Sequence, residues 1–228
     1  FGPSISGGKC STLCMTNPEV RRIILAELVK NIEKDRLALA NKPAYQYPAI
    51  YDLSQPDGGS CGECWCQGCR QLAEAEGSYS GPNLAFINAL AGEVKEKYPE
   101  ICLRTFAYSY TAKAPLTIQA ADNVIVQFCR AYLYDPLVPG SLNAAELEKW
   151  GSHTRNKSVW SYWRIYQGPL YPFVKKRGDI AAELRFCRDQ GVIHYFAEDE
   201  DPLSRSFAML QHWLMLKMLE DPAQDVFA

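Results

Sequence analysis

The sequence predicts an α/β protein, and within that class part of a (β/α)8 barrel. Five strand-like runs alternate with helix-like runs, and this favours parallel pairing because a parallel connection needs a crossover of about a dozen residues or more. No glycine-rich phosphate loop follows a strand, which argues against a nucleotide-binding doubly wound sheet. Polar and aromatic residues instead follow several strands, where (β/α)8 barrels keep their active sites.

The number of strand–helix units indicates which part of a barrel the chain forms. A whole barrel has eight such units in about 250 residues, and this chain of 228 residues shows five. We therefore expect a single domain, residues 1–228, that forms strands four to eight of a (β/α)8 barrel. The chain opens with Phe1 rather than Met, and the remainder of its own parent protein is expected to supply the earlier strands.

The first helix is expected to begin near residue 18. Thr16 and Asn17 are cap candidates, and Pro18 and Glu19 suit a first helical turn. Apolar residues then recur at helical spacing: Val20, Ile23, Ile24, Leu28 and Ile32. A β-branched and aromatic run over residues 48–54, ending in Pro-Asp-Gly-Gly, predicts the first strand and the turn that closes it.

The remaining elements follow the same two periodicities. A helix is expected over residues 80–98, with one apolar face: Leu84, Ile87, Ala91, Val94 and Tyr98. Asn143 with Glu146 resembles a capping box at the start of the helix that contains Trp150. A further helix over residues 179–189 is expected to end at Gly191, and a long apolar helix spans residues 203–219. The four remaining strands are expected over residues 101–108, 123–129, 158–165 and 192–197.

Composition excludes several classes of function. With 47% hydrophobic and 22% charged residues, the chain is typical of globular proteins. A formal charge of -2 without a basic stripe argues against nucleic acid as a partner. No apolar run reaches the roughly 18 residues that span a bilayer, so we expect no membrane span. The first residues also lack the pattern of a signal peptide.

Five short motifs carry a resemblance to a known family: Ser54-Gln55-Pro56-Asp57-Gly58, Cys64-Trp65-Cys66-Gln67-Gly68-Cys69, Asn83-Leu84-Ala85-Phe86-Ile87-Asn88, Ala107-Tyr108-Ser109-Tyr110 and Val159-Trp160-Ser161-Tyr162. Together they resemble a bacterial endo-β-N-acetylglucosaminidase-like glycoside hydrolase family, formerly a domain of unknown function (DUF4838-like). The resemblance covers residues 14–225. It implies a (β/α)8 barrel that acts on N-glycans.

Three acidic residues are candidates for catalysis. Glycoside cleavage usually takes two carboxyl groups, although an N-acetylhexosamine substrate can use its own acetamide as the nucleophile. Asp57 is the first choice because it follows the strand over residues 48–54, and Glu63 is a candidate partner if its loop folds back. Glu198, expected just past the last strand, is the third candidate. The alternatives are a turn-forming role for Asp57 and solvated loop positions for Glu63 and Glu198.

Residues that could hold a sugar lie near the same strand ends. Aromatic rings could stack on the flat apolar faces of sugars, and polar side chains could bind their hydroxyls. The substrate-binding candidates are Ser54, Gln55, Tyr108, Tyr110, Trp160 and Tyr162. Strand alternation puts Trp160 and Tyr162 on one face and Val159, Ser161 and Trp163 on the other. The resemblance implies that the first pair faces the barrel interior. His194 is expected to be a hydrogen-bonded core residue.

The cysteine-rich loop holds two C-x-x-C pairs separated by one residue: Cys61, Cys64, Cys66 and Cys69. Such pairs indicate a zinc site when they are farther apart, and the short separation makes a site from these four cysteines cramped. Cys10 and Cys14 are further candidate ligands. Disulfides, which suit an exported enzyme, and free thiols remain alternatives. In each case the expected role is structural, namely stiffening the loop behind Asp57.

These observations predict a glycoside hydrolase acting on N-acetylglucosamine-containing glycans. Catalysis is expected to need no cofactor, whereas a structural zinc ion is an option. The partners would be a glycan or glycoprotein substrate and the remainder of the parent protein. The expected location is periplasmic, cell-surface or secreted. The alternatives are a non-catalytic carbohydrate-binding barrel and a metal-stabilised interaction module.

Overall fold

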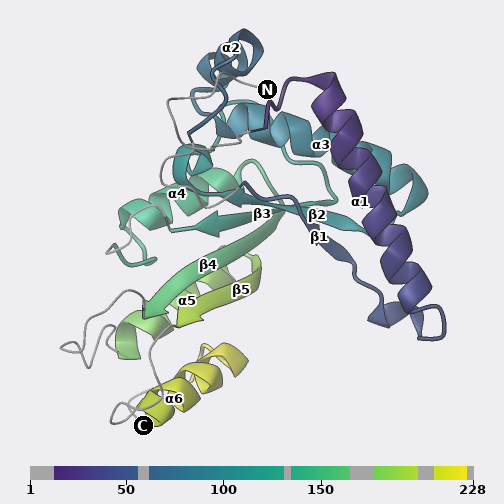
Figure 1. The fold of residues 1–228 in the computed structure, drawn as a ribbon. Coiled ribbons are helices and arrows are strands. Elements are labelled where there is room, and N and C mark those ends of the chain that lie inside the picture. The colour runs from purple at the N-terminus through teal and green to yellow at the C-terminus, as the bar shows by residue number, and fades with distance from the viewer. Residues whose placement is uncertain (1–12, 56–61, 131–134, 165–176, 200–207, 225–228) are drawn as a thin grey trace. The chain divides into compact units, whose positions relative to one another are not determined.

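The computed structural model describes residues 13–55, 62–130, 135–164, 177–199 and 208–224. The chain has an α/β fold (Figure 1). The strands are β1 (Ile50–Asp52), β2 (Cys102–Ala107), β3 (Val124–Cys129), β4 (Asn156–Arg164) and β5 (Val192–Asp199). The helices are α1 (Pro18–Ala38), α2 (Gln67–Glu76), α3 (Ser80–Lys97), α4 (Leu142–Gly151), α5 (Arg177–Asp189) and α6 (Ala208–Glu220), with short 3-10 turns η1 (Ala44–Gln46) and η2 (Ser109–Thr111).

The five strands form one sheet in the order in which they occur along the chain, β1-β2-β3-β4-β5. β1 pairs with β2 in parallel, and β4 pairs with β5 in parallel. Strands in chain order with helical connections are what a (β/α)8 barrel contains. Here α-helices connect the strands except between β2 and β3, where only the 3-10 turn η2 occurs. The predicted α/β class, the five strands and the parallel pairing are therefore confirmed, and the arrangement is consistent with part of such a barrel.

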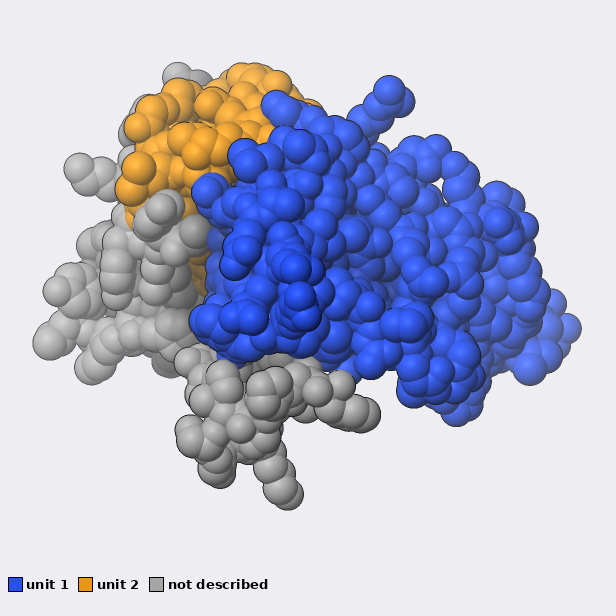
Figure 2. Space-filling model, turned by 90° about the horizontal axis from the view of Figure 1, so that it is seen from above, with its two compact units in different colours: residues 1–127, 152–156 blue, residues 128–151, 157–228 orange. Residues whose placement is uncertain are grey.

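The chain divides into two compact units (Figure 2). Unit 1 comprises residues 1–127 and 152–156, and unit 2 comprises residues 128–151 and 157–228. The division falls within β3, whose six residues are all buried. Each unit has its own candidate site and is therefore described by itself.

In unit 1, α1 begins as the sequence predicts. The Asn17 side chain accepts a hydrogen bond from the Glu19 backbone N–H at 2.9 Å, and Pro18 occupies the first turn. These two features satisfy or remove N–H groups that a helix start leaves unpaired. The expected apolar face is only partly buried, since Val20, Leu28 and Ile32 are buried but Ile23 is 47% exposed.

The core of unit 1 lies between α3 and β2. The five predicted apolar positions of α3 are all buried, as are alternate residues of β2. Asn83 on α3 donates a hydrogen bond to Thr105 of β2 at 3.1 Å, so the polar pair inside this core is satisfied. β1 pairs with β2 in a register that puts Asp52 opposite Arg104, and the two side chains form an ion pair.

In unit 2, one face of β4 and β5 packs on helices. Tyr195 and Ala197 of β5 contact a buried apolar cluster formed by α5 and α6: Ile180, Ala181, Leu184, Met215 and Met218. The register pairs Trp160 with Phe196 and Tyr162 with Glu198. Because side chains alternate along a strand, these four residues lie on the face opposite the one that contacts α5 and α6.

Three details of the sequence interpretation are wrong. Residues 67–76 form α2, where only a cysteine-rich loop was expected, although Cys69, Leu72 and Ala73 recur at helical spacing. Ser141, not Asn143, caps α4: its Oγ accepts from the Ala144 N–H at 3.1 Å. β5 extends to Asp199, so Glu198 belongs to the strand rather than to the following loop.

Candidate functional site

Four cysteine side chains converge in unit 1. Cys64 and Cys66 precede α2, Cys69 lies in its first turn, and Cys14 comes from the segment before α1. Their Sγ atoms all lie within 4.8 Å of one another, and three of the four residues are buried. Cys14 Sγ lies 3.4 Å from Cys66 Sγ and 3.9 Å from Cys69 Sγ. Four thiolates this close together could hold a metal ion such as zinc.

The backbone before α2 shapes one side of this cluster. Cys66 is the N-cap of α2, and its Sγ accepts a hydrogen bond from the Cys69 N–H at 3.4 Å. That bond lowers the pKa of Cys66 to about 6, with further help from the side chains of Thr16 and Cys14. Burial raises the pKa of Cys64 to about 12 and also raises the pKa of Cys69. Cys66 is therefore the thiol of this cluster that most readily binds a cation at neutral pH.

Thr16 and Gly68 complete the surroundings of the cluster. The Thr16 hydroxyl lies 3.4 Å from Cys69 Sγ and 3.6 Å from Cys66 Sγ and Cys14 Sγ. A Cβ added at Gly68 would lie 2.8 Å from Thr16 Oγ1, so a residue with a side chain would push Thr16 away. Gly68 could not be singled out from the sequence, because the contact joins residues that are far apart in the chain.

The structure changes the membership of the predicted cysteine site. Cys64, Cys66 and Cys69 are brought together as expected, and Cys14, an alternative ligand in the sequence interpretation, is the fourth member. Cys61 and Cys10 lie outside the described residues. The seven cysteines that the structure describes are all free thiols.

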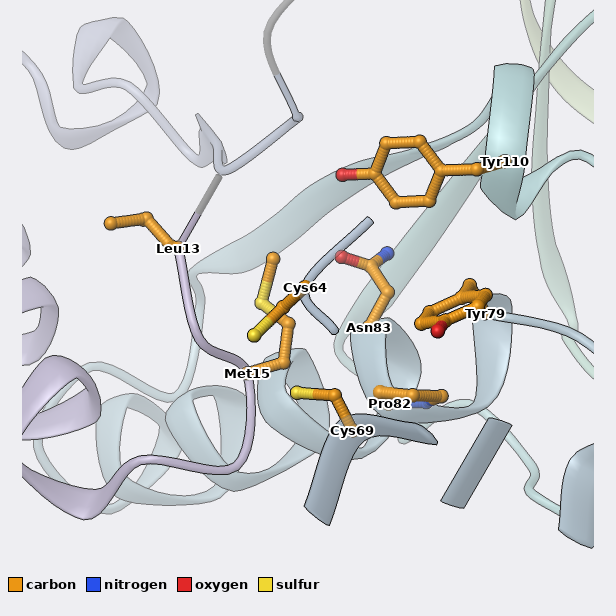
Figure 3. Close-up of a pocket in the computed structure, with 8 residues that line it drawn as sticks. All are labelled: Leu13, Met15, Cys64, Cys69, Tyr79, Pro82, Asn83 and Tyr110. Carbon is orange, nitrogen blue, oxygen red and sulfur yellow. The ribbon is translucent and has the colours of Figure 1, made fainter. Parts of the chain in front are cut away.

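The space beside the cysteines is too small for an organic ligand. Figure 3 shows a cavity lined by Leu13, Met15, Cys64, Cys69, Tyr79, Pro82, Asn83 and Tyr110, and its volume is about 10 Å³. A cavity of this size holds about one water molecule. The apolar side chains around the sulfurs therefore exclude solvent rather than bind a substrate.

A wider surface hollow of about 450 Å³ lies over α2. Trp65 stands between two of the clustered cysteines, is 50% exposed and lines this hollow. The other lining residues are Arg70, Ala73, Glu74, Gly77, Ser78 and Tyr79. An exposed ring beside charged side chains is a surface on which a sugar ring could stack.

Three predicted site residues of unit 2 lie together on one face of β4 and β5, from the middle of β4 toward the carboxyl end of β5. Trp160 Nε1 donates a hydrogen bond to Glu198 Oε2 at 2.9 Å. Tyr162 is opposite Glu198 in the strand register. The centre of the Phe196 ring lies 4.4 Å from the centre of the Trp160 ring. Phe196, which is 41% exposed, was not predicted as a site residue. Its position directly across from Trp160 follows only from the register.

A buried charged network supports these strand ends. Arg130, which follows β3, lies 3.5 Å from the Glu183 carboxylate on α5, and their side chains are 3% and 0% exposed. Glu183 also accepts hydrogen bonds from Ser161 and, at 2.6 Å, from the Tyr195 hydroxyl. The Arg130 guanidinium lies 6.0 Å from the centre of the Tyr162 ring. An arginine directly after a buried apolar strand was the signal in the sequence, and it was overlooked.

Predicted sugar-binding residues of unit 1 have partners within the protein. Gln55 is buried, and its Nε2 donates to Tyr108 O at 2.9 Å and to Thr111 Oγ1 at 2.6 Å. The Ser54 hydroxyl donates to Asp52 Oδ1 at 2.8 Å. Gln55 therefore ties the end of β1 to the turn after β2, which is a structural role.

Glu63 lies close to two tyrosines of unit 1. Burial raises the pKa of Tyr110 to about 12, and the Glu63 carboxylate adds to this rise. Burial and Glu63 also raise the pKa of Tyr79, whose ring meets that of Tyr110 edge-on with centres 6.4 Å apart. Asp57, the first catalytic candidate, lies outside the described residues.

His194 differs from its prediction as a core residue. It is hydrogen-bonded, with Nδ1 2.9 Å from Ser158 Oγ, but it is exposed. It shares the face of Trp160 and Phe196, which is opposite the face that packs on α5 and α6.

The comparisons with known proteins identify the family. A family model described as "Domain of unknown function (DUF4838)" matches residues 5–228, so this chain belongs to that family. None of the curated proteins matches the chain. In the described part of the chain, no helix has both the length and the apolar character that crossing a membrane requires.

Proposed function

We propose that this chain forms strands four to eight of a (β/α)8 glycoside hydrolase that cleaves glycans containing N-acetylglucosamine. The observation that carries the proposal is the hydrogen bond from Trp160 Nε1 to Glu198 Oε2. It joins a carboxylate near the carboxyl end of β5 to an aromatic ring in the middle of the neighbouring parallel strand β4. Barrels of this type place their catalytic residues at the carboxyl ends of their strands, where Glu198 lies. The resemblance of the motifs to endo-β-N-acetylglucosaminidases supports the choice of substrate.

The proposed chemistry uses two carboxyl groups with different roles. An indole N–H only donates, so Glu198 Oε2 acts as an acceptor in its contact with Trp160. We therefore assign Glu198 the role of the ionised group, which acts as nucleophile, as base, or by orienting the acetamide of the substrate. The acid that protonates the leaving oxygen stays a prediction from the sequence, with Asp57 as the first candidate and Glu63 as the alternative.

The aromatic side chains near Glu198 would hold the sugar. Trp160 and Phe196 have adjacent rings on the face that helices α5 and α6 leave open, and Tyr162 adds a third ring beside Glu198. Such rings stack on the apolar faces of sugars. Arg130 lies against Tyr162 and would keep that ring in place.

The proposal also covers the surroundings of the reaction. Carboxyl chemistry needs no cofactor, so a metal ion at the four cysteines would serve structure alone. The substrate would be a glycan or glycoprotein, and the remainder of the parent protein would complete the barrel. Because N-glycoproteins are met outside the cytoplasm, we propose a periplasmic, cell-surface or secreted location.

The test measures release of free glycan from a complex N-glycoprotein by the full-length parent protein. Glu198→Gln and Asp57→Asn should each lower kcat about 10²- to 10⁴-fold, the usual contribution of a positioned acid or base. Glu148→Gln, which removes an exposed acid from α4 in the same unit, is the matched control and should keep full activity. If Glu198→Gln retains full activity, Glu198 has no part in the reaction.

Trp160→Phe tests the hydrogen bond separately from the ring. This variant keeps an aromatic face but cannot donate to Glu198, so it should lower kcat with little change in KM. An unchanged kcat would show that the indole N–H does not position the carboxylate.

A second function, glycan binding without cleavage, is favoured by the exposed Trp65 ring in the hollow over α2. In that case no variant and no parent protein releases glycan, yet the protein binds a chitooligosaccharide measurably. Trp65→Ala should then weaken binding about fivefold or more, since loss of a stacking ring costs of the order of 1 kcal/mol or more. Binding unaffected by Trp65→Ala would rule out this surface.

A further inference from the structure

The spacing of the four clustered sulfur atoms matches a single tetrahedral metal ion. Zinc binds thiolate sulfur at about 2.3 Å, so the four sulfurs of a tetrahedral site lie about 3.8 Å apart. Here Cys14 Sγ lies 3.4 Å from Cys66 Sγ and 3.9 Å from Cys69 Sγ, and all four sulfurs lie within 4.8 Å. We propose that Cys14, Cys64, Cys66 and Cys69 bind one Zn²⁺ ion with four thiolates.

The arrangement is unlike that of paired disulfides. A disulfide joins two sulfurs at about 2.05 Å and requires its own dihedral geometry. In this cluster Cys14 is close to Cys66 and to Cys69 at comparable distances, and Cys64 lies within the same limit. Neither of these separations is that of a disulfide bond, and the cysteines that the structure describes are free thiols. Four sulfurs facing a common centre are what a metal ion requires.

The residues around the sulfurs provide the second set of contacts that metal sites need. Ligands in such sites are oriented by outer hydrogen bonds. The Cys69 N–H points at Cys66 Sγ, and the Thr16 hydroxyl lies 3.4 to 3.6 Å from three of the four sulfurs. Gly68 allows this approach, since a Cβ there would meet Thr16 Oγ1 at 2.8 Å. The segment before α1 and the start of α2 are therefore in close contact at the proposed ligands.

The ligand set limits the choice of metal and indicates the role of the ion. Four soft thiolates in a tetrahedron suit zinc or a single iron ion, and a closed set of four protein ligands marks a structural rather than a catalytic zinc site. A four-iron cluster would spread its four thiolates farther apart, around the corners of a cube. The cavity beside the sulfurs has about 10 Å³ of space, so no substrate can reach the ion from that side.

The proposed ion links two parts of unit 1. Cys14 precedes α1, whereas the other three ligands lie just before α2 and in its first turn. They follow Cys14 by 50 to 55 residues. A crosslink over such a loop contributes to folding, and the binding energy of a structural zinc ion becomes folding energy. Zinc would also hold the backbone on both sides of Trp65.

The test is the metal content of the whole chain, expressed with added zinc and purified under reducing conditions. We expect about one zinc per chain by mass spectrometry of the metal. Replacement by Co²⁺ should give the intense visible and near-ultraviolet bands of a tetrahedral four-thiolate site. Cys14→Ser should lower zinc affinity more than about tenfold, since even outer contacts contribute that much.

Two further variants separate ligand loss from misfolding. Cys14→His keeps a metal-binding side chain and should retain zinc in a three-cysteine, one-histidine site, even if Cys14→Ser fails to fold. Cys102→Ser, at a free cysteine on β2, is the matched control and should keep the full zinc content. Absence of metal from the reduced native protein, two disulfides in its intact mass, stoichiometric iron, or full zinc affinity in Cys14→Ser would each overturn the proposal.

Discussion

Gly68→Ala is the substitution that most directly tests how the segment before α1 packs on α2. Gly68 is the second residue of α2, and its added Cβ would lie 2.8 Å from Thr16 Oγ1 and 3.3 Å from Thr16 Cβ. Both distances are shorter than ordinary van der Waals contact, so Thr16 must move. Because the Thr16 hydroxyl contacts three of the clustered sulfurs, its displacement disturbs the metal site as well.

The expected free energy change is the sum of two opposing effects. Replacing a helical glycine with alanine stabilises a helix by about 0.5–1 kcal/mol. Overpacking a filled contact costs about 1–3 kcal/mol. The net effect expected for Gly68→Ala is therefore a loss of about 1 kcal/mol in the free energy of unfolding. Zinc affinity should fall as well, because an outer contact of the ligands is displaced.

Gly92→Ala is the matched control for this prediction. Gly92 lies on the exposed side of α3, and a Cβ there would meet nothing within 4 Å. This variant should gain about 0.5–1 kcal/mol, since only the helix preference changes. Urea unfolding monitored by circular dichroism at a fixed zinc concentration measures the free energy of unfolding of both variants.

The double variant Gly68→Ala with Thr16→Ala identifies the source of the loss. Removing Oγ1 takes away the closest contact, so the two substitutions should be non-additive, with Thr16→Ala costing less in the Gly68→Ala background. The reasoning is refuted if Gly68→Ala stabilises the protein as much as Gly92→Ala does. In that case residue 16 does not pack against α2, and the geometry inferred for the cysteine cluster is wrong.

Two buried acids, Glu76 in unit 1 and Glu183 in unit 2, each give a prediction for the stability of their unit. In unit 1, burial raises the pKa of Glu76, but the hydroxyl and N–H of Thr117 and the Ile118 N–H outweigh it and leave the pKa below its ordinary value. Glu76→Gln should cost about 1.5–3 kcal/mol at pH 7. The difference in free energy of unfolding between this variant and the unchanged protein should be complete above pH about 4.3, and it should shrink as the pH falls through the lower folded pKa of Glu76. Equal losses at pH 7 and at low pH in urea unfolding would contradict this. In unit 2, Glu183→Gln should lower the free energy of unfolding by about 3–5 kcal/mol in thermal or urea unfolding, because it leaves a buried arginine charge without its carboxylate. The control Glu220→Gln, in an exposed pair with Lys217, should lower it by at most about 1 kcal/mol. Similar losses in the two variants would show that the Glu183 network contributes little.

Much of the fold follows from local sequence patterns. The strand over residues 101–108 and the helix over residues 80–98 were predicted within a residue or two of their observed ends, because a period of 2 or of 3.6 is visible within one segment. The cap at Asn17 was predicted for the same reason, since its hydrogen bond goes to a residue two positions away. By contrast, α2 was missed although Cys69, Leu72 and Ala73 recur at helical spacing, because the run of cysteines was interpreted only as a loop.

The candidate site was only partly predictable. Trp160, Tyr162 and Glu198 were selected from their places near strand ends, but the Trp160–Glu198 hydrogen bond depends on the register of β4 against β5. A shift of one residue would turn Glu198 to the other face. Phe196 was overlooked because an aromatic residue within a strand gives no local sign of which partner it faces.

The sequence by itself determined the order of the five strands and of the helices other than α2, most of their apolar faces, and the crowding of cysteines near residue 66. Each of these depends on residues within one or two turns of chain. Only the tertiary structure decided that Cys14 joins the cluster, that Thr16 packs on Gly68, and that Arg130 pairs with Glu183. These contacts join segments separated by dozens of residues. They depend on how packed elements bring side chains to common points in space, and local periodicity carries no record of that.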